Sequence, residues 1–117
     1  MDFAAKKCVP CEGGTEPHSR LKVEEYLLAV PGWQVDADFT RINREFTLKN
    51  FKAALQFVNQ IGDIAEAEGH HPNLELFSWN HLKVVLYTHA IDGLSDNDFI
   101  MAAKINLLWN SQTSAKA

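Results

Sequence analysis

The chain has 117 residues, of which 46% are hydrophobic and 22% are charged, and its formal net charge is −4. Such a chain is long enough for one globular domain with its own hydrophobic core. The negative charge, without a stripe of Lys or Arg, argues against direct binding of nucleic acid. No apolar run approaches the roughly 20 residues that span a bilayer, and the mixed, polar start lacks the pattern of a secretory signal. We therefore expect a soluble, cytoplasmic, single-domain protein without membrane association.

Residues 1–19 contain proline, glycine and few apolar anchors, which predicts a flexible N-terminal arm. Cys8 and Cys11 within it form a CxxC pair, which occurs as half of a zinc site or as a redox dithiol. Zinc would need two further ligands, and His18 is the nearest candidate in the sequence. A redox pair normally lies at a strand-to-helix junction, which this segment does not resemble. The alternative is that both cysteines belong to an inert tail.

A first helix is predicted to open at Glu16 or Ser19 and to end near Val30, where Pro31 and Gly32 stop it. Two strands follow at 33–36 and 39–46, with a turn at 36–38. Residues 50–68 give the strongest helical pattern, and Gly69 stands where a C-terminal glycine cap belongs. Apolar residues at helical spacing form the predicted buried face of this second helix: Phe51, Ala54, Leu55, Val58, Ile61 and Ala65.

Two more strands are predicted at 74–79 and 80–89, and a last helix from Ser95 to about Trp109, followed by a frayed tail at 111–117. In the second of these strands, Leu82, Val84, Leu86 and Thr88 share one face. Apolar residues also occur on the opposite face, which predicts self-association or a covered pocket. The element order predicts an α+β fold, an α-β-β-α-β-β-α two-layer sandwich whose four-stranded antiparallel sheet carries helices on one face.

Three of the five histidines lie near element ends in this scheme: His70 and His71 after the second helix, and His89 at the end of a strand. The simplest explanation is that these rings are solvated, with one of them at the negative end of the helix dipole. Zinc binding by the three is a second possibility, although the usual spacing of histidine ligands is missing. General acid–base catalysis is the third, because an imidazole gains and loses a proton near neutral pH.

Two acidic residues accompany these histidines. Ser95 and Asp98 fit a capping box, with Ser95 as N-cap and Asp98 three residues later, and we place capping before catalysis for Asp98. Glu66 lies one helical turn before His70, where it either faces solvent or contacts a histidine or a ligand.

The spacing from Glu66 through His70-His71-Pro72, Trp79 and Thr88-His89 to Asp98 resembles the signature of the pterin-4a-carbinolamine dehydratases. The resemblance covers residues 20–108, within an expected family domain at 20–110. It implies dehydration of 4a-hydroxytetrahydropterin to the quinonoid dihydropterin, with pterin as substrate and without a metal or a bound cofactor. This step recycles the pterin of the aromatic amino-acid hydroxylases.

By the same resemblance His70, His71 and His89 are the catalytic histidines, and no metal site is expected. The residues expected to bind substrate are Glu66, Pro72, Thr88, Ala90 and Asp98. Family relatives form homodimers or homotetramers. Some also act as dimerisation cofactors of a transcription factor, so a non-catalytic binding or assembly module with a protein partner is the alternative function.

Overall fold

The computed structural model describes residues 2–10 and 16–115, and its main elements follow the order expected from the sequence. The helices are α1 (Arg20–Leu27), α2 (Phe51–Glu68) and α3 (Asp96–Ala115). The strands are β1 (Gln34–Val35), β2 (Ile42–Thr47), β3 (Asn73–Phe77) and β4 (His81–Leu86). Two short 3₁₀ helices are η1 (Phe3–Ala5) and η2 (His89–Ile91).

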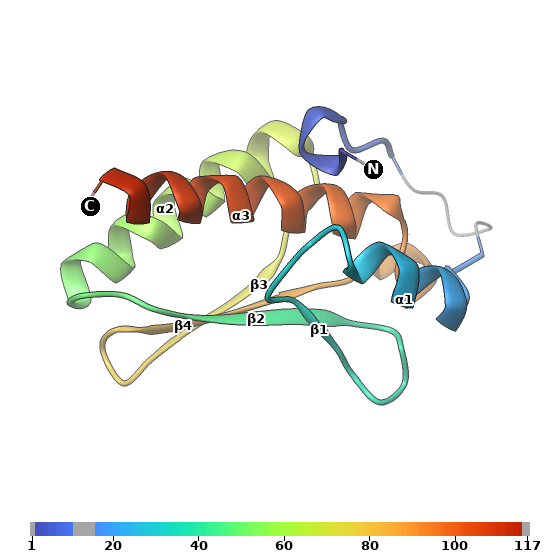
Figure 1. Ribbon diagram of the computed structural model, residues 1–117, viewed down its shortest axis with the longest axis horizontal. Helices are drawn as coiled ribbons and strands as arrows, with labels where there is room; N and C mark the ends of the chain where they lie inside the picture. The colour runs from blue at the N-terminus through green and yellow to red at the C-terminus, as the bar shows by residue number, and fades with distance from the viewer. Residues whose placement is uncertain (1, 11–15, 116–117) are drawn as a thin grey trace.

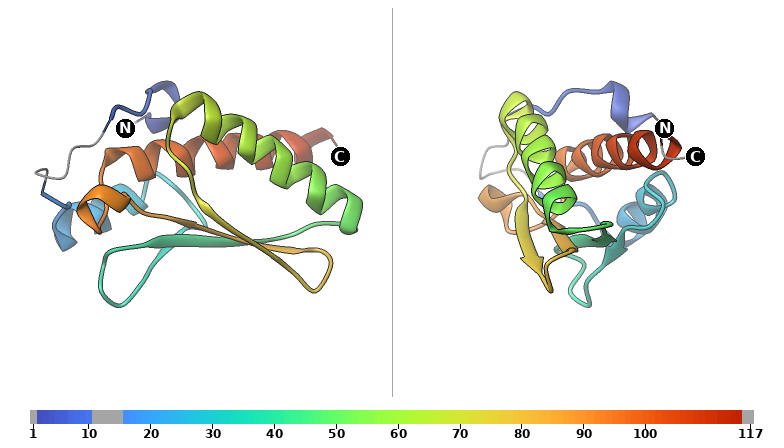
Figure 2. Two further views of the ribbon diagram at one scale, coloured as in Figure 1. Left: turned by 180° about the vertical axis from the view of Figure 1, so that it is seen from behind. Right: turned by 90° about the vertical axis from the view of Figure 1, so that its left-hand side faces the viewer.

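The four strands form one antiparallel sheet in the order β1-β2-β4-β3. β2 and β4 pair along their whole length, from Ile42 opposite Leu86 to Thr47 opposite His81. Helices α2 and α3 contact each other and lie over one face of the sheet (Figures 1 and 2). The predicted α+β sandwich with helices on one face is confirmed.

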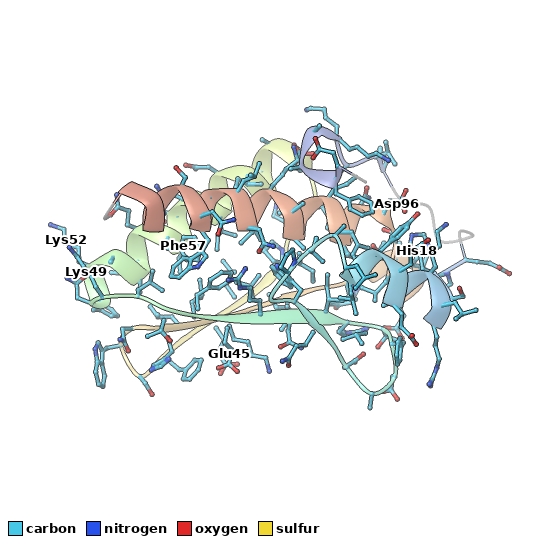
Figure 3. The ribbon with its side chains drawn as sticks, in the orientation of Figure 1. His18, Glu45, Lys49, Lys52, Phe57 and Asp96 are labelled. Atoms are coloured by element: carbon cyan, nitrogen blue, oxygen red, sulfur yellow. The ribbon has the colours of Figure 1, made fainter. Side chains whose placement is uncertain are left out.

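The core lies between the sheet and these helices. Leu82, Val84 and Leu86 of β4 are all 0% exposed, as their alternation predicted. Phe57 extends from α2 toward the sheet, whereas Glu45 of β2 points away from the helices (Figure 3). Burial of such apolar side chains contributes roughly 1.5–3 kcal/mol each and is the main stabilising term of the fold.

Helix α2 begins and ends at the predicted residues because both ends are capped. The Asn50 side chain accepts a hydrogen bond from the Ala53 amide. Gly69 takes a φ of 67°, and its amide donates to the carbonyl of Ala65. The next residues of the chain therefore leave the helix in a fixed direction.

The buried face of α2 differs from the predicted one. Phe51 and Leu55 were expected on it, yet they are 50% and 42% exposed. Phe57, which the prediction left out, is 0% exposed and packs edge-on against Phe46, with ring centroids 5.0 Å apart. The apolar positions allow two overlapping stripes, and packing against β2 selects the one that contains the larger aromatic pair.

The described part of the N-terminal arm packs on the helices, so the prediction of a loose arm over 1–19 is wrong for these residues. Phe3 is 1% exposed, and its ring centroid lies 4.9 Å from that of Tyr26 and 5.8 Å from that of Phe99. His18 and Asp96 point toward each other, with 2.7 Å between Nε2 and Oδ1 (Figure 3). These partners are distant in sequence, so no local pattern predicted them.

Helix α3 continues to Ala115, into the segment 111–117 that was predicted to fray, while 116 and 117 lie outside the described residues. A hydrogen bond from the Gln112 amide to Gln60 of α2 links this last part of the helix to α2.

The strands are shorter than predicted at both hairpins. Among the helices that the structure describes, none is both long and apolar enough to cross a membrane.

Candidate active site

A pocket of about 290 Å³ opens where the end of α2, the residues after β4 and the start of α3 meet. Its lining residues are Val9, Pro10, Gly69, His70, His71, Tyr87, Thr88, His89, Ala90 and Asn97. The three histidines proposed from the sequence therefore line one cavity, although they come from two loops of the chain.

The end of α2 delivers His70 and His71 to this pocket. After the left-handed turn at Gly69, the His70 amide still donates to the carbonyl of Ala65 over 3.3 Å. Pro72 fixes the backbone before β3 begins at Asn73. As a result His70 turns inward, with its side chain 11% exposed, whereas the side chain of His71 is 62% exposed.

The third histidine, His89, follows β4 by three residues. The sequence placed it at a strand end, and this was wrong: β4 stops at Leu86 and His89 begins the 3₁₀ helix η2. An antiparallel bridge between Thr88 and Gly93 closes the turn, with the Thr88 amide 2.8 Å from the Gly93 carbonyl. The bridge buries Thr88 to 2% exposure and turns His89 to the exposed rim.

Asp98 lies behind His70 and is 0% exposed. Its Oδ1 is 2.7 Å from Nε2 of His70, and its Oδ2 accepts hydrogen bonds from the Ser95 amide at 3.0 Å and the Thr88 hydroxyl at 2.8 Å. The bond from Ser95 is the predicted capping contact, which is confirmed. The same carboxylate therefore caps α3 and holds a ring of the pocket.

The donors in this network can be assigned from chemistry. Because Thr88 donates to Asp98, the hydroxyl of Ser95 must donate to Thr88 across their 2.6 Å contact. Asp98 has acceptor atoms facing His70, so Nε2 of His70 carries a hydrogen and Nδ1 is the nitrogen left for other partners.

The other two histidines also have partners. Nε2 of His71 lies 2.5 Å from Oε2 of Glu66, so of the alternatives open to Glu66 the structure shows contact with a histidine. Nδ1 of His89 lies 3.1 Å from the hydroxyl of Tyr87. The guanidinium of Arg41 in turn lies 3.6 Å from the centroid of the Tyr87 ring.

Of the residues expected to bind substrate, Thr88 and Ala90 line the pocket. Glu66 reaches it through His71, Asp98 is covered by His70, and Pro72 is not among the lining residues. Val9, Pro10 and Asn97 also line the pocket and were not predicted from the sequence. Tyr87 shares a strand parity with His89, and that parity was the one available signal for it.

Cys8 of the CxxC pair is half-buried, and its thiol lies 3.6 Å from the carbonyl oxygen of Asn97. Burial, with the nearby Glu68 carboxylate, raises the pKa of this thiol to about 12, the opposite of what a reactive thiolate requires. Cys11 lies outside the described residues, so zinc or redox chemistry of the pair stays a hypothesis. Within the described ranges 2–10 and 16–115, no three His, Cys, Asp or Glu side chains are grouped as metal ligands.

The architecture and the pocket together define an α+β protein with a site that histidine side chains line, one of which contacts a buried carboxylate. Comparison of the chain with known families finds a match over residues 16–108 to the family described as pterin 4 alpha carbinolamine dehydratase. The chain belongs to this family. The resemblance inferred from the histidine spacing is thereby confirmed.

Individual relatives agree with this assignment. "Putative pterin-4-alpha-carbinolamine dehydratase" of Halorhodospira halophila is 45% identical over 108 residues, which cover 92% of this chain and 98% of the relative. "Pterin-4-alpha-carbinolamine dehydratase 2, mitochondrial" of Arabidopsis thaliana is 44% identical over 110 residues, covering 92% of this chain and 59% of that protein. A solved structure described as a transcriptional coactivator/pterin dehydratase from Brucella melitensis superposes with a TM-score of 0.74 at 32% identity, covering 80% of this chain and 98% of that one.

Proposed function

We propose that this protein removes water from 4a-hydroxytetrahydropterin to give the quinonoid dihydropterin, with His70, His71 and His89 as its acid–base groups. The observation that carries the proposal is the inward-facing His70, held by the buried carboxylate of Asp98 in a pocket that two further histidines line. Family membership supplies the class of substrate.

The reaction has two proton requirements. The hydroxyl on carbon 4a must receive a proton to leave as water, and a ring nitrogen of the pterin must give up a proton as the new double bond forms. One proton is delivered and one is taken up, so the two sides of the reaction balance without any oxidant. Two imidazoles on opposite sides of a ligand can supply both steps.

Geometry favours His70 as the group that takes up a proton. Asp98 keeps the hydrogen on Nε2, which leaves the lone pair of Nδ1 available as a base. His71 and His89 lie nearer the rim, and either one fits the role of acid toward the leaving hydroxyl. Positioned acid–base groups of this kind typically accelerate a step by about 10²- to 10⁴-fold.

The remaining residues bind and orient in this proposal. Thr88 and Ala90 contact the pterin, while Glu66 holds His71 and Asp98 holds His70. The mechanism uses no resident metal or cofactor, since pterin is the substrate. We place the protein in pterin recycling in the cytoplasm, although the Arabidopsis relative carries a mitochondrial name.

The proposal is tested by following the decay of chemically generated 4a-hydroxytetrahydropterin in the presence and absence of the protein. We expect faster decay with the wild type and near-background decay with His70→Ala or His89→Ala. Equal decay with and without wild-type protein would contradict the proposal.

A second function, as an assembly module or transcriptional cofactor that acts through protein contacts, is favoured by the open face of the sheet and by the similarity to the Brucella protein, which is described as a transcriptional coactivator. Trp79, at the tip of the β3–β4 hairpin, is 66% exposed and has a φ of 57°, which is unusual for a bulky residue.

We propose that the open face of the sheet binds a second copy of the chain in a homodimer or homotetramer. A monomer mass in light scattering at micromolar concentration would contradict self-association, and a stoichiometric partner retained by a His70→Ala variant would support the second function.

A further inference from the structure

The N-terminal arm reaches the pocket from outside the matched family region, which begins at residue 16. Residues 8–10, which we call the strap, run from the end of α2 to the first turn of α3. Val9 and Pro10 belong to the pocket lining. We propose that the strap is a wall of the binding site and that Val9 determines which pterin side chains the pocket accepts; this inference rests on the proposed function.

The strap is held by a two-way clasp. The Asn97 amide accepts from the Val9 amide at 3.0 Å through Oδ1 and donates to the Val9 carbonyl at 2.6 Å through Nδ2. Asn97 is 4% exposed, so the side chain that makes both bonds is itself buried. Both bonds go to the backbone of Val9, a residue that is 65% exposed, so its side chain remains available to a ligand at the pocket mouth.

A second anchor lies one residue earlier. The Cys8 amide donates to Oε1 of Glu68 at 2.8 Å, and Lys104 lies 3.5 Å from Oε2 of the same carboxylate. The Lys104 ammonium also donates to the carbonyl of Ala4 at 3.1 Å. The strap is thus fixed to both α2 and α3.

These anchors adjoin His70 and Asp98. Glu68 ends α2 two residues before His70, and Asn97 directly precedes Asp98 in α3. A strap fixed at both places keeps its wall at a constant distance from the histidines. Substitutions in the wall should therefore change ligand selection more than the chemical step.

The experiment compares the binding of two dihydropterins, one with a methyl and one with a dihydroxypropyl side chain, by quenching of intrinsic fluorescence. We expect Val9→Trp to weaken binding of the larger ligand by about fivefold or more relative to the smaller one, because the bulkier indole at the pocket mouth leaves less room for the longer side chain. Leu21→Trp, at an 80% exposed position on α1, is the matched control and should leave the ratio unchanged. A ratio for Val9→Trp within about twofold of wild type would overturn the inference.

A second measurement follows the clasp itself through Cys8. In a Cys11→Ser background, Cys8 is the one remaining cysteine of the chain, and its labelling rate reports strap opening. Asn97→Ala should speed labelling by about tenfold, while Asn59→Ala on the exposed side of α2 should not. Equal rates in both variants would show that the clasp does not hold the strap.

The two proposals fail in different ways. If the wild type accelerates dehydration but Val9→Trp leaves the binding ratio of the two ligands unchanged, only the strap inference is contradicted. If Val9→Trp changes the binding ratio of the two ligands but the wild type does not accelerate dehydration, the proposed reaction is contradicted. The strap would then still form the wall of a pterin-binding site.

Discussion

Nε2 of His70 lies 2.7 Å from Oδ1 of Asp98, and the carboxylate is fully buried. Asp98 thereby has both of the roles that its sequence position left as alternatives. Its Oδ2 caps the start of α3 through the Ser95 amide, and its Oδ1 orients a ring of the pocket. A helix start rigidly fixed in this way is a precise support for the ring of His70.

Replacing Asp98 by Asn tests this support. The amide retains one oxygen for the capping bonds and turns its NH₂ group toward His70, which reverses the hydrogen-bond direction at Nε2. We expect turnover to fall by about tenfold or more at nearly unchanged thermal stability. Asp96→Asn, an identical change on an exposed residue of the same turn, should retain turnover. Equal turnover of the two variants would remove Asp98 from the mechanism.

Tyr87→Phe tests the support of His89. The substitution removes the hydroxyl that lies 3.1 Å from Nδ1 and leaves the ring beneath the Arg41 guanidinium. Because one ordinary hydrogen bond is lost at an exposed site, kcat should fall about threefold to tenfold while substrate binding changes little. The measurement is steady-state kinetics of the variant beside the wild type. A change confined to KM would assign Tyr87 to binding.

Glu68 gives the fold a defined acid dependence. The hydrogen bond from the Cys8 amide holds the pKa of this carboxyl below its ordinary value. A lowered folded-state pKa adds stability that is complete above the pKa of the unfolded chain and is lost as the pH falls through the folded value. Glu68→Gln should therefore melt at a lower temperature than wild type at neutral pH, and the gap should close as the pH falls through the lowered pKa of Glu68. A gap that stays constant over the acid range would contradict the role of this charge.

A buried polar cluster around Asn106 lies away from the pocket, and we expect its disruption to lower the stability of the fold. Oδ1 of Asn106 accepts from the Trp33 indole at 2.9 Å and from the Arg44 guanidinium at 2.6 Å. Asn106→Leu leaves these donors without that acceptor and should lower the free energy of unfolding by about 2 kcal/mol. Denaturant titration measures this, with Asn59→Leu on the exposed side of α2 as the control. A loss of equal size in both variants would show that the effect does not come from the hydrogen bonds of Asn106.

Features of the fold and the site that depend on contacts between residues close in sequence can be predicted from the sequence, whereas those that depend on distant residues cannot. Asn50 and Gly69 bound α2 by local capping, so its limits were predicted closely. The packing of Phe3 and the clasp of Asn97 on the strap span most of the chain, and no periodicity encodes them. The three histidines were found by their spacing, whereas the contact of His70 with Asp98, 28 residues away, required the fold.

The central claim is that His70 acts in the dehydration of a pterin carbinolamine. The most direct measurement is the decay rate of 4a-hydroxytetrahydropterin with wild type, His70→Ala and His81→Ala, because His81 lies on β4 and outside the pocket lining. We predict wild-type rates for His81→Ala and a loss of about a hundredfold or more for His70→Ala. Equal rates for the two variants, or no acceleration by the wild type, would contradict the account.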